Sequence, residues 1–355
     1  MTSTLPRSAH LTSVQVDPCR DSRWLELARH RDLFHAPPWL RVLSTTYGFD
    51  LKASLLLEPN GVARAGFVYA TVDDFLGTRI VSLPFSDYCD PLVERGEDWN
   101  RLIEGPLATG HRIHLRCLHN QLPAGDERFA VTGRGHWHAI DLGGGQDDLW
   151  VRLHPSARRA IRKAEGSGIR VSVASRDEDL AAFYNLHLRV RKYKYGLLVQ
   201  PRQFFAELHH EFLDPGYGML LLAQHEGVTV GGVLFLRWGN RLYYKFNASL
   251  PEFLEYRPND LILWEAIRMA ADTGIDYIDL GHTDWDHEGL LRYKEKYATR
   301  RSEVTYVRRT PPAVPDHKER EARSLLSGLT EVLTDPTVPD ELSARAGDLI
   351  YRYFV

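Results

Sequence analysis

Basic side chains crowd a short stretch in the middle of the chain. Between Arg152 and Arg170 there are six arginines and lysines and one acid, Glu165, a net charge of +5 in a protein whose overall charge is -3. Such a cluster can bind the phosphates of a nucleic acid, and the alternative is the solvated face of an ordinary helix. The candidate nucleic-acid-binding residues are Arg158, Arg159, Arg162 and Lys163.

A second group pairs arginine with tyrosine along one predicted helix. Arg191 and Tyr195 are one helical turn apart and share a face, as do Arg189 and Tyr193. Guanidinium forks and phenol hydroxyls suit recognition of phosphate or carboxylate groups. Tyr244, on a later predicted strand, is a further candidate. The alternative is an amphipathic helix with solvated basic side chains, and both pairs remain candidates for ligand binding.

A carboxylate stands in the short loop Pro84–Tyr88. Asp87 in this loop is in a plausible place to take a proton from an attacking ammonium, as a general base does. Asp90 is an alternative base. The competing interpretation is that Asp87 only stabilises a turn through its side chain.

Sixteen histidines raise the question of a metal site. His136 and His138 alternate on a predicted strand, and residues 282–288 hold two histidines with three acids. None of these spacings matches a zinc pattern, and no Walker loop or Gly-x-Ser-x-Gly motif occurs. We therefore predict no metal and no bound cofactor.

Length and composition indicate an ordinary globular protein. The 355 residues suggest two domains, and 43% hydrophobic with 26% charged residues is a normal balance. The overall negative charge does not favour DNA binding. The sequence lacks an apolar run of about 18 residues and begins without the apolar stretch of a signal peptide. Three scattered cysteines fit a reducing cytoplasm.

The elements that would hold the candidate residues form two groups. The first half predicts an α/β domain, and three glycines at 143–145 then interrupt the pattern and mark a boundary. Its expected elements are helices at 38–47 and 98–107 and strands at 51–57, 62–71, 112–118 and 136–142.

The second half predicts two helices, an antiparallel meander, a helix, a strand, a helix and a strand, which is the order of a GNAT acyltransferase domain. The expected helices are 156–165, 177–195, 201–212, 259–273 and 288–297, and the strands are 169–173, 219–224, 229–238, 241–248, 275–280 and 303–308. A proline-rich stretch at 311–315 leads to a charged helical tail. Its end carries Leu349, Ile350, Tyr351 and Phe354, so we expect the tail to pack on the body.

The fold class predicted from this order is α/β (α+β), and the family resemblance described below implies two tandem GNAT-like acyltransferase domains whose mixed central sheets are flanked by helices. The predicted divisions are residues 1–145, residues 146–310, and a linker with helical tail at 311–355.

Several motifs, in order, resemble the FemABX superfamily of aminoacyltransferases. The resemblance covers residues 83–308 and is stronger after residue 153. No long heptad seam is present, so the chain resembles FemX-like members without a coiled-coil arm. Those members add single residues to peptidoglycan precursors or modify antibiotic amino groups from aminoacyl-tRNA. The motifs are 83–88, 90–92, 189–196, Pro201, Phe204-Phe205, 243–249, Pro258-Asn259, 264–267, 279–281 and 289–294.

The resemblance implies roles for particular residues. Lys294 matches a family lysine that stabilises the oxyanion of the transfer reaction or binds acceptor phosphate. The alternative is a solvated helix lysine beside Lys296. Asp87 matches an aspartate discussed as a base, and the basic patch would hold a tRNA acceptor stem. The implied substrate-binding residues are Arg191, Tyr195, Tyr244, Arg189 and Asn259.

The run 163–168 superficially resembles the acetyl-CoA pyrophosphate loop. It follows a predicted helix, whereas a phosphate is held at a helix N-terminus, so Gly168 reads as a helix stop. The segment before Pro258, where such a loop is expected, has no glycine-rich run, which argues against a CoA donor.

The resulting prediction is an aminoacyl-tRNA-dependent aminoacyltransferase that forms an amide on an amine held between the domains, without a covalent enzyme intermediate. The acceptor would be a peptidoglycan precursor or an antibiotic or other amino-sugar natural product. The protein would be cytoplasmic, with charged tRNA as its partner. The alternatives are an acyl-CoA-dependent N-acyltransferase on the same fold and a non-catalytic binding protein in envelope or polysaccharide assembly.

Overall fold

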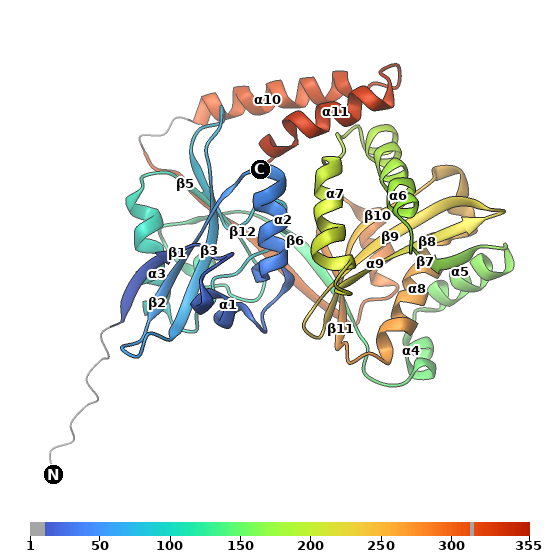
Figure 1. Cartoon of the computed structure of the whole chain (residues 1–355), viewed down its shortest axis with the longest axis horizontal. Coiled ribbons are helices and arrows are strands. Elements are labelled where there is room, and N and C mark those ends of the chain that lie inside the picture. Colours follow the sequence, from blue (N-terminus) through green and yellow to red (C-terminus); the bar gives the residue numbers. More distant parts are fainter. Residues whose placement is uncertain (1–10, 313–315) are drawn as a thin grey trace, which may run out of the picture. The chain divides into compact units, whose positions relative to one another are not determined.

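The computed structural model describes residues 11–312 and 316–355. These residues form two compact units. The first takes in residues 11–40, 49–133 and 305–312, and the second takes in residues 41–48, 134–304 and 316–355. Each unit is described by itself below, with element labels as in Figure 1.

The first unit is built on a mixed sheet. Its strands follow the spatial order β1-β2-β3-β4-β5-β12, antiparallel at every pairing except the parallel pair β4–β5. Helices α1 (Ser22–Ala28) and α3 (Gly96–Ala108) pack on this sheet. The strands are β1 (Thr12–Val16), β2 (Asp50–Leu57), β3 (Ala63–Val72), β4 (Arg79–Val81), β5 (Arg112–Cys117) and β12 (Arg300–Arg309).

Aromatic side chains fill the core of the first unit. Phe67 of β3 and Trp99 of α3 meet edge to face, with ring centroids 5.7 Å apart, among other buried apolar residues. Gly66 of β3 is required for the packing of α1, because a Cβ there would lie 2.7 Å from Leu27 Cδ2. Burial of these large side chains is the main source of stability for such a unit.

The second unit contains a sheet with one parallel pairing. The strands follow the order β6-β11-β10-β9-β8-β7, and only β10 and β11 run parallel. The strands are β6 (Ala130–Asp141), β11 (Tyr277–Asp284), β10 (Arg241–Ser249), β9 (Val228–Trp238), β8 (Gly218–His225) and β7 (Arg170–Val173).

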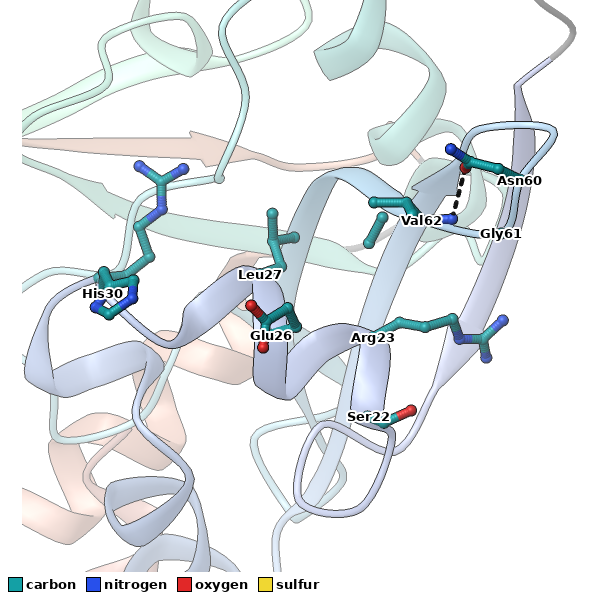
Figure 2. A pocket seen from close by; sticks show the side chains of 10 residues that line it. Ser22, Arg23, Glu26, Leu27, His30, Asn60, Gly61 and Val62 are labelled. Carbon is teal, nitrogen blue, oxygen red and sulfur yellow. Dashed lines mark hydrogen bonds between the residues drawn. The ribbon is translucent and has the colours of Figure 1, made fainter.

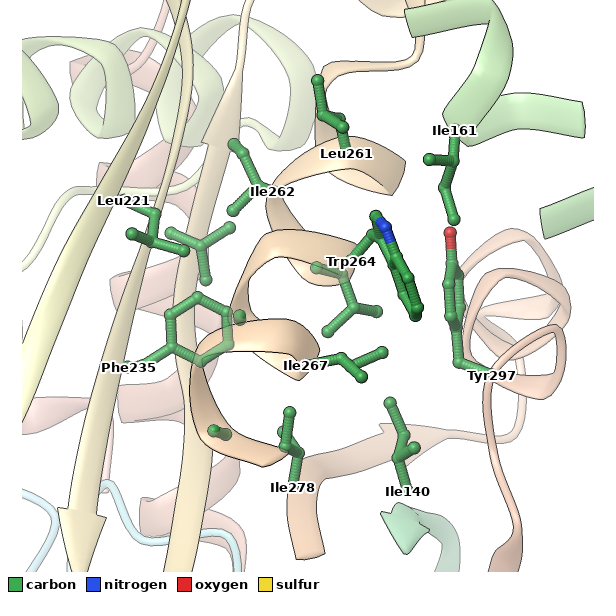
Figure 3. Close-up of a cluster of buried hydrophobic side chains, with 14 of the residues drawn as sticks. Ile140, Ile161, Leu221, Phe235, Leu261, Ile262, Trp264, Ile267, Ile278 and Tyr297 are labelled. Atoms are coloured by element: carbon green, nitrogen blue, oxygen red, sulfur yellow. The ribbon is translucent and has the colours of Figure 1, made fainter. Parts of the chain in front are cut away.

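Helices cover both faces of this second sheet. Leu221 of β8 points into a buried cluster with α5 (Pro155–Gly166) and α8 (Pro258–Ala271), shown in Figure 3. Leu222 points to the opposite face, because side chains alternate along a strand. There the ring of Phe183 on α6 (Asp177–Arg189) lies so close to β9 that a Cβ on Gly232 would be 2.8 Å from it.

The remaining elements complete the second unit. Short helices α4 (Gln146–Arg152) and α9 (Glu288–Glu295) flank the sheet, and α7 (Arg202–Leu208) lies beside α6. Helices α6 and α7 each continue into a π-helical turn, Val190–Lys194 and His209–Leu213. Helix α2 (Pro37–Tyr47) passes from the first unit to the second.

The C-terminal tail forms α10 (Asp316–Leu333), α11 (Asp340–Ile350) and a 3-10 turn (Tyr351–Tyr353), all within the second unit. Tyr351 is buried and stacks on Tyr47 with ring centroids 6.3 Å apart. The predicted packing of the tail is therefore confirmed at Tyr351. It is wrong for Leu349, which is 71% exposed.

The order of elements agrees with the prediction, whereas the units divide elsewhere in the chain. The glycines at 143–145 only connect β6 to α4, and the change of unit falls between Gly133 and Arg134, inside β6. Strand β12 likewise passes from one unit to the other, because its end pairs with β5. Gly168, with φ +79°, ends α5 as predicted. In the described residues no helix is both long and apolar enough to cross a membrane.

Candidate active site

Strands β10 and β11 are paired only over their first residues. The parallel ladder joins residues 241–243 to residues 277–279 and ends there. Beyond it, β10 has a bulge between Tyr244 and Phe246, and β11 has one between Asp279 and His282. Ligands of open α/β sheets bind at the carboxyl ends of parallel strands, and bulges are frequent beside active sites. The candidate site lies at these strand ends.

The bulge in β11 is fixed by two hydrogen bonds. The Oδ1 atom of buried Asp279 accepts from the backbone N–H of Gly281 at 2.7 Å and from Nε1 of Trp137 at 2.9 Å. Gly281 has φ +72°, a conformation that favours glycine. The sequence Asp-Leu-Gly at 279–281 thus dictates the local shape of the strand.

The ammonium of Lys294 is held by this bulge. Its Nζ atom donates to the carbonyl oxygen of Gly281 at 3.0 Å and to that of His282 at 2.9 Å, and the residue is only 4% exposed. The alternative of a solvated helix lysine is therefore wrong. The neighbouring Lys296 instead pairs with Asp260 at 2.5 Å. A buried cation held by carbonyl dipoles can stabilise negative charge that develops beside it.

His138 lies opposite the same bulge. Between the pairs Ala139–Asp279 and Trp137–His282, this one residue of β6 faces two residues of β11. Its side chain shares the β6 face of Ile140, the face that also meets Tyr297. Burial, together with the charges of Lys294, His136 and Arg301, lowers the pKa of His138 to about 4, so the imidazole is neutral at pH 7.

Tyr244 and Asn259 support the site from β10 and α8. Burial raises the pKa of Tyr244, so its hydroxyl stays protonated. The Oδ1 atom of Asn259 accepts from Asn247 Nδ2 at 2.9 Å and from Ser249 Oγ at 2.5 Å. Asn259 therefore ties the start of α8 to β10, and its side-chain oxygen is already engaged. Its predicted role in substrate binding stays a prediction.

The arginine–tyrosine motif spans the end of α6 and the π-helical turn, and Arg191 and Tyr193 in the turn contact the tail. Arg191 donates from Nε to the carbonyl oxygen of Leu198 at 2.9 Å and lies over the ring of Tyr351. Tyr195 is 53% exposed and Arg189 is also exposed. The structure does not bring Arg191 and Tyr195 into one environment.

The basic patch is displayed on α5. Ala157, Ile161 and Ala164 bury one side of this helix, and its basic side chains cover the other. Arg162 lies over the ring of Trp150, 5.4 Å from the centroid. Within the described part of the chain no carboxylate forms an ion pair with any residue of the patch. Its exposed members are Arg159, Arg162 and Lys163, and Arg158 is half-buried.

In the first unit, the loop that carries Asp87 is held from several sides. Phe85 has φ +56°, an uncommon conformation for a bulky residue that marks a constrained backbone. Trp39 Nε1 donates to Ser86 Oγ at 2.9 Å, and Arg116 Nη1 donates to the Ser86 carbonyl at 3.0 Å. Asp87 itself is partly exposed. A constrained loop with an accessible carboxylate agrees with a functional role.

Asp90 has a structural role. Its carboxylate is 4% exposed and accepts from the backbone N–H groups of Leu118 at 2.8 Å, Asn120 at 3.0 Å and His119 at 3.2 Å. The Asp90 carboxylate thus holds the backbone of residues 118–120 in place. The alternative of Asp90 as the base is wrong on this geometry, because the carboxylate is buried and engaged.

A buried Cys-His-Asp arrangement, which the sequence analysis did not predict, also supports this loop. His35 Nδ1 is 2.9 Å from Asp32 Oδ1, its Nε2 donates to the Asp90 carbonyl at 2.7 Å, and Cys89 Sγ lies 3.5 Å from Nε2. These types could form a nucleophilic site. Both ring nitrogens of His35 are engaged, one with Asp32 and one with the Asp90 carbonyl, so neither is left to activate Cys89 and the group stabilises the fold instead.

The histidine-rich segments do not form a metal cluster in the described residues, and one surface hollow lies beside α1. In the described residues no three histidine, cysteine, aspartate or glutamate side chains gather as metal ligands, and His282 simply lies 3.3 Å from Asp284. A hollow of about 600 Å³ near Leu27 and Val62 is shown in Figure 2. Its Arg23 is engaged with Asp21 at 2.6 Å.

Comparison with known proteins identifies relatives of this fold. Residues 153–309 match the Acetyltransferase (GNAT) domain family. The Lipid II:glycine glycyltransferase of Staphylococcus epidermidis is 31% identical over 87 residues, which are 23% of this chain and 21% of that protein. The Staphylococcus aureus enzyme of the same name is 32% identical over 84 residues, 22% of this chain and 20% of that one. The chain thus spans about a fifth of the length of these relatives.

Solved structures agree over almost the whole chain. The crystal structure of FemX has a TM-score of 0.65 at 15% identity and covers 89% of this chain and 100% of its own. A tandem GNAT protein from the clavulanic acid biosynthesis pathway has a TM-score of 0.53 at 13% identity and covers 86% and 100%. The chain therefore shares the fold of FemX and of a tandem GNAT protein, as the sequence predicts.

Proposed function

We propose that this FemABX-like chain is an aminoacyltransferase that joins an activated aminoacyl group to an amine. One observation carries the proposal. A buried lysine ammonium is fixed by two backbone carbonyls at the bulged carboxyl end of β11, inside the segment that matches the GNAT domain. The local identity to Lipid II:glycine glycyltransferases supports a peptidoglycan precursor as the acceptor class, and an amino-sugar natural product is the second candidate.

The proposed reaction is direct attack by the acceptor amine on the carbonyl carbon of the donor ester. A C–N bond forms, the C–O bond to the donor breaks, and the proton lost by the nitrogen ends on the departing oxygen. Asp87 first takes one proton from the acceptor ammonium and releases it to solvent, so that the neutral amine can attack. Lys294 then stabilises the oxyanion of the tetrahedral intermediate. The donor ester supplies the driving force, so the protein needs to bind, orient and stabilise charge.

Charged tRNA is the proposed donor. The exposed cations of α5 carry no carboxylate partner in the described part of the chain and are available for phosphates. An acyl-CoA donor on the same fold is the second candidate, supported by the GNAT match. The run 163–168 does not supply its pyrophosphate site, because it ends a helix instead of beginning one.

The test is a transfer assay with a pool of charged tRNAs carrying labelled amino acids and a panel of amines that includes a peptidoglycan precursor and amino sugars. A parallel set contains acyl-CoA, and each set is run with and without ribonuclease. Ribonuclease-sensitive transfer of one amino acid supports the proposal. Activity with acyl-CoA alone means that the donor is acyl-CoA and not charged tRNA. Absence of transfer in every set overturns the assignment as an enzyme.

Asp87→Asn tests in this assay the proposed role of Asp87 as the base, separately from the role of Lys294 in stabilising the oxyanion. If Asp87 is the base, we expect a fall in turnover of about 10²-fold with unchanged thermal unfolding. Asp73→Asn, on an exposed loop of the same unit, is the control with the same chemical change. Turnover at the wild-type level in Asp87→Asn would mean that another group, not Asp87, takes the proton.

A further inference from the structure

The face of β6 that carries His138 changes from apolar to polar at this residue. Ile140, two residues further along the strand, is part of the buried cluster under α8, whereas His138 and His136 continue the same face with imidazoles. Across the strand pair, Thr283 is opposite His136 and so projects to the same side. A buried polar face beside a core needs hydrogen-bond partners.

Two polar atoms on this face have no such partner. His138 Nδ1 and Thr283 Oγ1 are buried, each in a residue 1% exposed, and neither has a hydrogen bond within the described residues. A buried donor or acceptor without a partner costs stability, and native proteins keep few of them. Such atoms mark a place that a ligand group can satisfy.

The same place lies beside the fixed cation. The bulge that His138 faces is the one whose carbonyls bind Lys294, and burial, followed by the charge of Lys294, lowers the pKa of the imidazole. A neutral imidazole keeps one N–H donor and carries no charge to repel the ammonium. A cation that lowers the pKa of a neighbouring histidine thereby favours the neutral form of the imidazole, which can still donate one hydrogen bond.

We propose that His138 is a second oxyanion-stabilising residue, which donates a hydrogen bond from its neutral imidazole to the donor carbonyl oxygen as Lys294 neutralises the developing charge. The inference rests on the proposed transferase function. It adds His138 as a second group, beside Lys294, that stabilises the donor carbonyl oxygen. The hydrogen bond strengthens as the carbonyl becomes an oxyanion, so it acts on turnover more than on substrate binding.

The test compares His138→Phe with His138→Gln in the tRNA transfer assay described above. Phenylalanine keeps the ring volume and removes the donor, so we expect kcat to fall about 10²-fold with KM nearly unchanged. Glutamine retains an N–H donor and should recover part of the loss. His225→Phe is the matched control, because this strand histidine stacks on Tyr256 at 4.9 Å elsewhere in the second unit.

Two further measurements separate this role from a structural one or from a base. Thermal unfolding and the fraction of active enzyme show whether His138→Phe folds, and the rescue by glutamine at equal folded fraction is not expected of a purely structural residue. A neutral donor gives a wild-type kcat that is flat from pH 5 to 7. A base with an ordinary histidine pKa gives a fall near pH 6.5.

The outcomes are distinct for the inference and for the proposed function. If folded His138→Phe transfers with the kcat of the wild type, the inference is overturned, while the proposed transferase function is unaffected. A loss that glutamine does not relieve, or an acid limb near pH 6.5 that disappears in the variants, also overturns the donor role. Absence of transfer by the wild-type protein overturns the function and the inference together.

Discussion

At the scale of single residues, burial decides which charges are available for chemistry. Lys294 and Lys296 are two residues apart, yet Lys296 is paired with Asp260 and Lys294 is held by two carbonyl dipoles. Carbonyls hold an ammonium in place without cancelling its charge as a carboxylate would. The bulge at Gly281 therefore positions the Lys294 ammonium toward the carboxyl end of β11.

Lys294→Met tests this arrangement. The substitution removes the charge, and we expect kcat to fall by about 10²- to 10³-fold. It also leaves two buried carbonyls without a donor, which costs about 1–3 kcal/mol of unfolding free energy. Transfer assays and thermal unfolding measure the two effects, and Lys318→Met on the exposed side of α10 is the control. Turnover near the wild-type level would remove Lys294 from the mechanism.

His187 makes the stability of the second unit depend on pH. Burial lowers its pKa to about 4, and the hydrogen bond with Gln200 only partly opposes this. The unfolded chain, with an ordinary histidine pKa of about 6.5, binds the proton first as pH falls. Stability is therefore present above pH 6.5 and is lost progressively down to about pH 4.

His187→Phe should flatten this dependence. The ring lies among Phe183, Phe205 and Phe246, so phenylalanine keeps the packing and removes the titration. Between pH 6.5 and pH 4 we expect the variant to lose up to about 3 kcal/mol less unfolding free energy than the wild type. Chemical denaturation at both pH values measures the difference, and equal losses in the two proteins would contradict the expectation.

At the scale of elements, the π-helical turn at Val190–Lys194 connects the signature motif to the tail. Lys192 is fully buried, and its ammonium bonds Asp340 Oδ1 at 2.9 Å, which also accepts from the Tyr193 hydroxyl at 2.7 Å. An α-helix would have aimed these side chains differently. The tail is thus attached by a buried charge whose partner comes from the start of α11.

Asp340→Asn should therefore loosen the tail. It leaves the Lys192 ammonium buried with a neutral partner, and we expect a loss of about 2–4 kcal/mol of unfolding free energy. The double variant Lys192→Met with Asp340→Asn removes the buried charge as well and should be more stable than the single one. Denaturation curves give both values. A double variant as unstable as the single one would show that the charge is unimportant.

The order of elements was accessible from the sequence because apolar periodicity and glycine or proline stops are local signals. Non-local features were not accessible. The π-turn gave no periodic signal, so the pairing of Arg191 with Tyr195 was predicted from α-helical spacing. The bulge at 279–281 depends on pairing with β6, and the predicted strand at 275–280 ends inside it. Lys294 was identified through the resemblance, and His138 was noted only as part of a metal hypothesis.

At the scale of the whole molecule, one face of α5 is positive in a chain whose net charge is -3. The basic face can attract phosphates only over about a Debye length, roughly 8–10 Å at physiological salt, so binding should depend on these few side chains. Nearby acids are not engaged with them in the described residues. This local charge is the feature that would distinguish a polynucleotide donor from a small thioester.

Reversing two of these charges tests the donor at this scale. In Arg159→Glu with Lys163→Glu, the affinity for charged tRNA should fall by about tenfold or more at physiological salt, because two phosphate contacts are replaced by repulsion. The slope of log Kd against log salt should fall by about 1.8, since each contact with a duplex such as the acceptor stem contributes about 0.9. Lys318→Glu with Arg320→Glu makes the same charge change on α10 and should leave both values unchanged. Equal loss in the two double variants would mean that overall charge, not the α5 face, governs binding, whereas unchanged affinity in the α5 variant would remove the patch from the donor site.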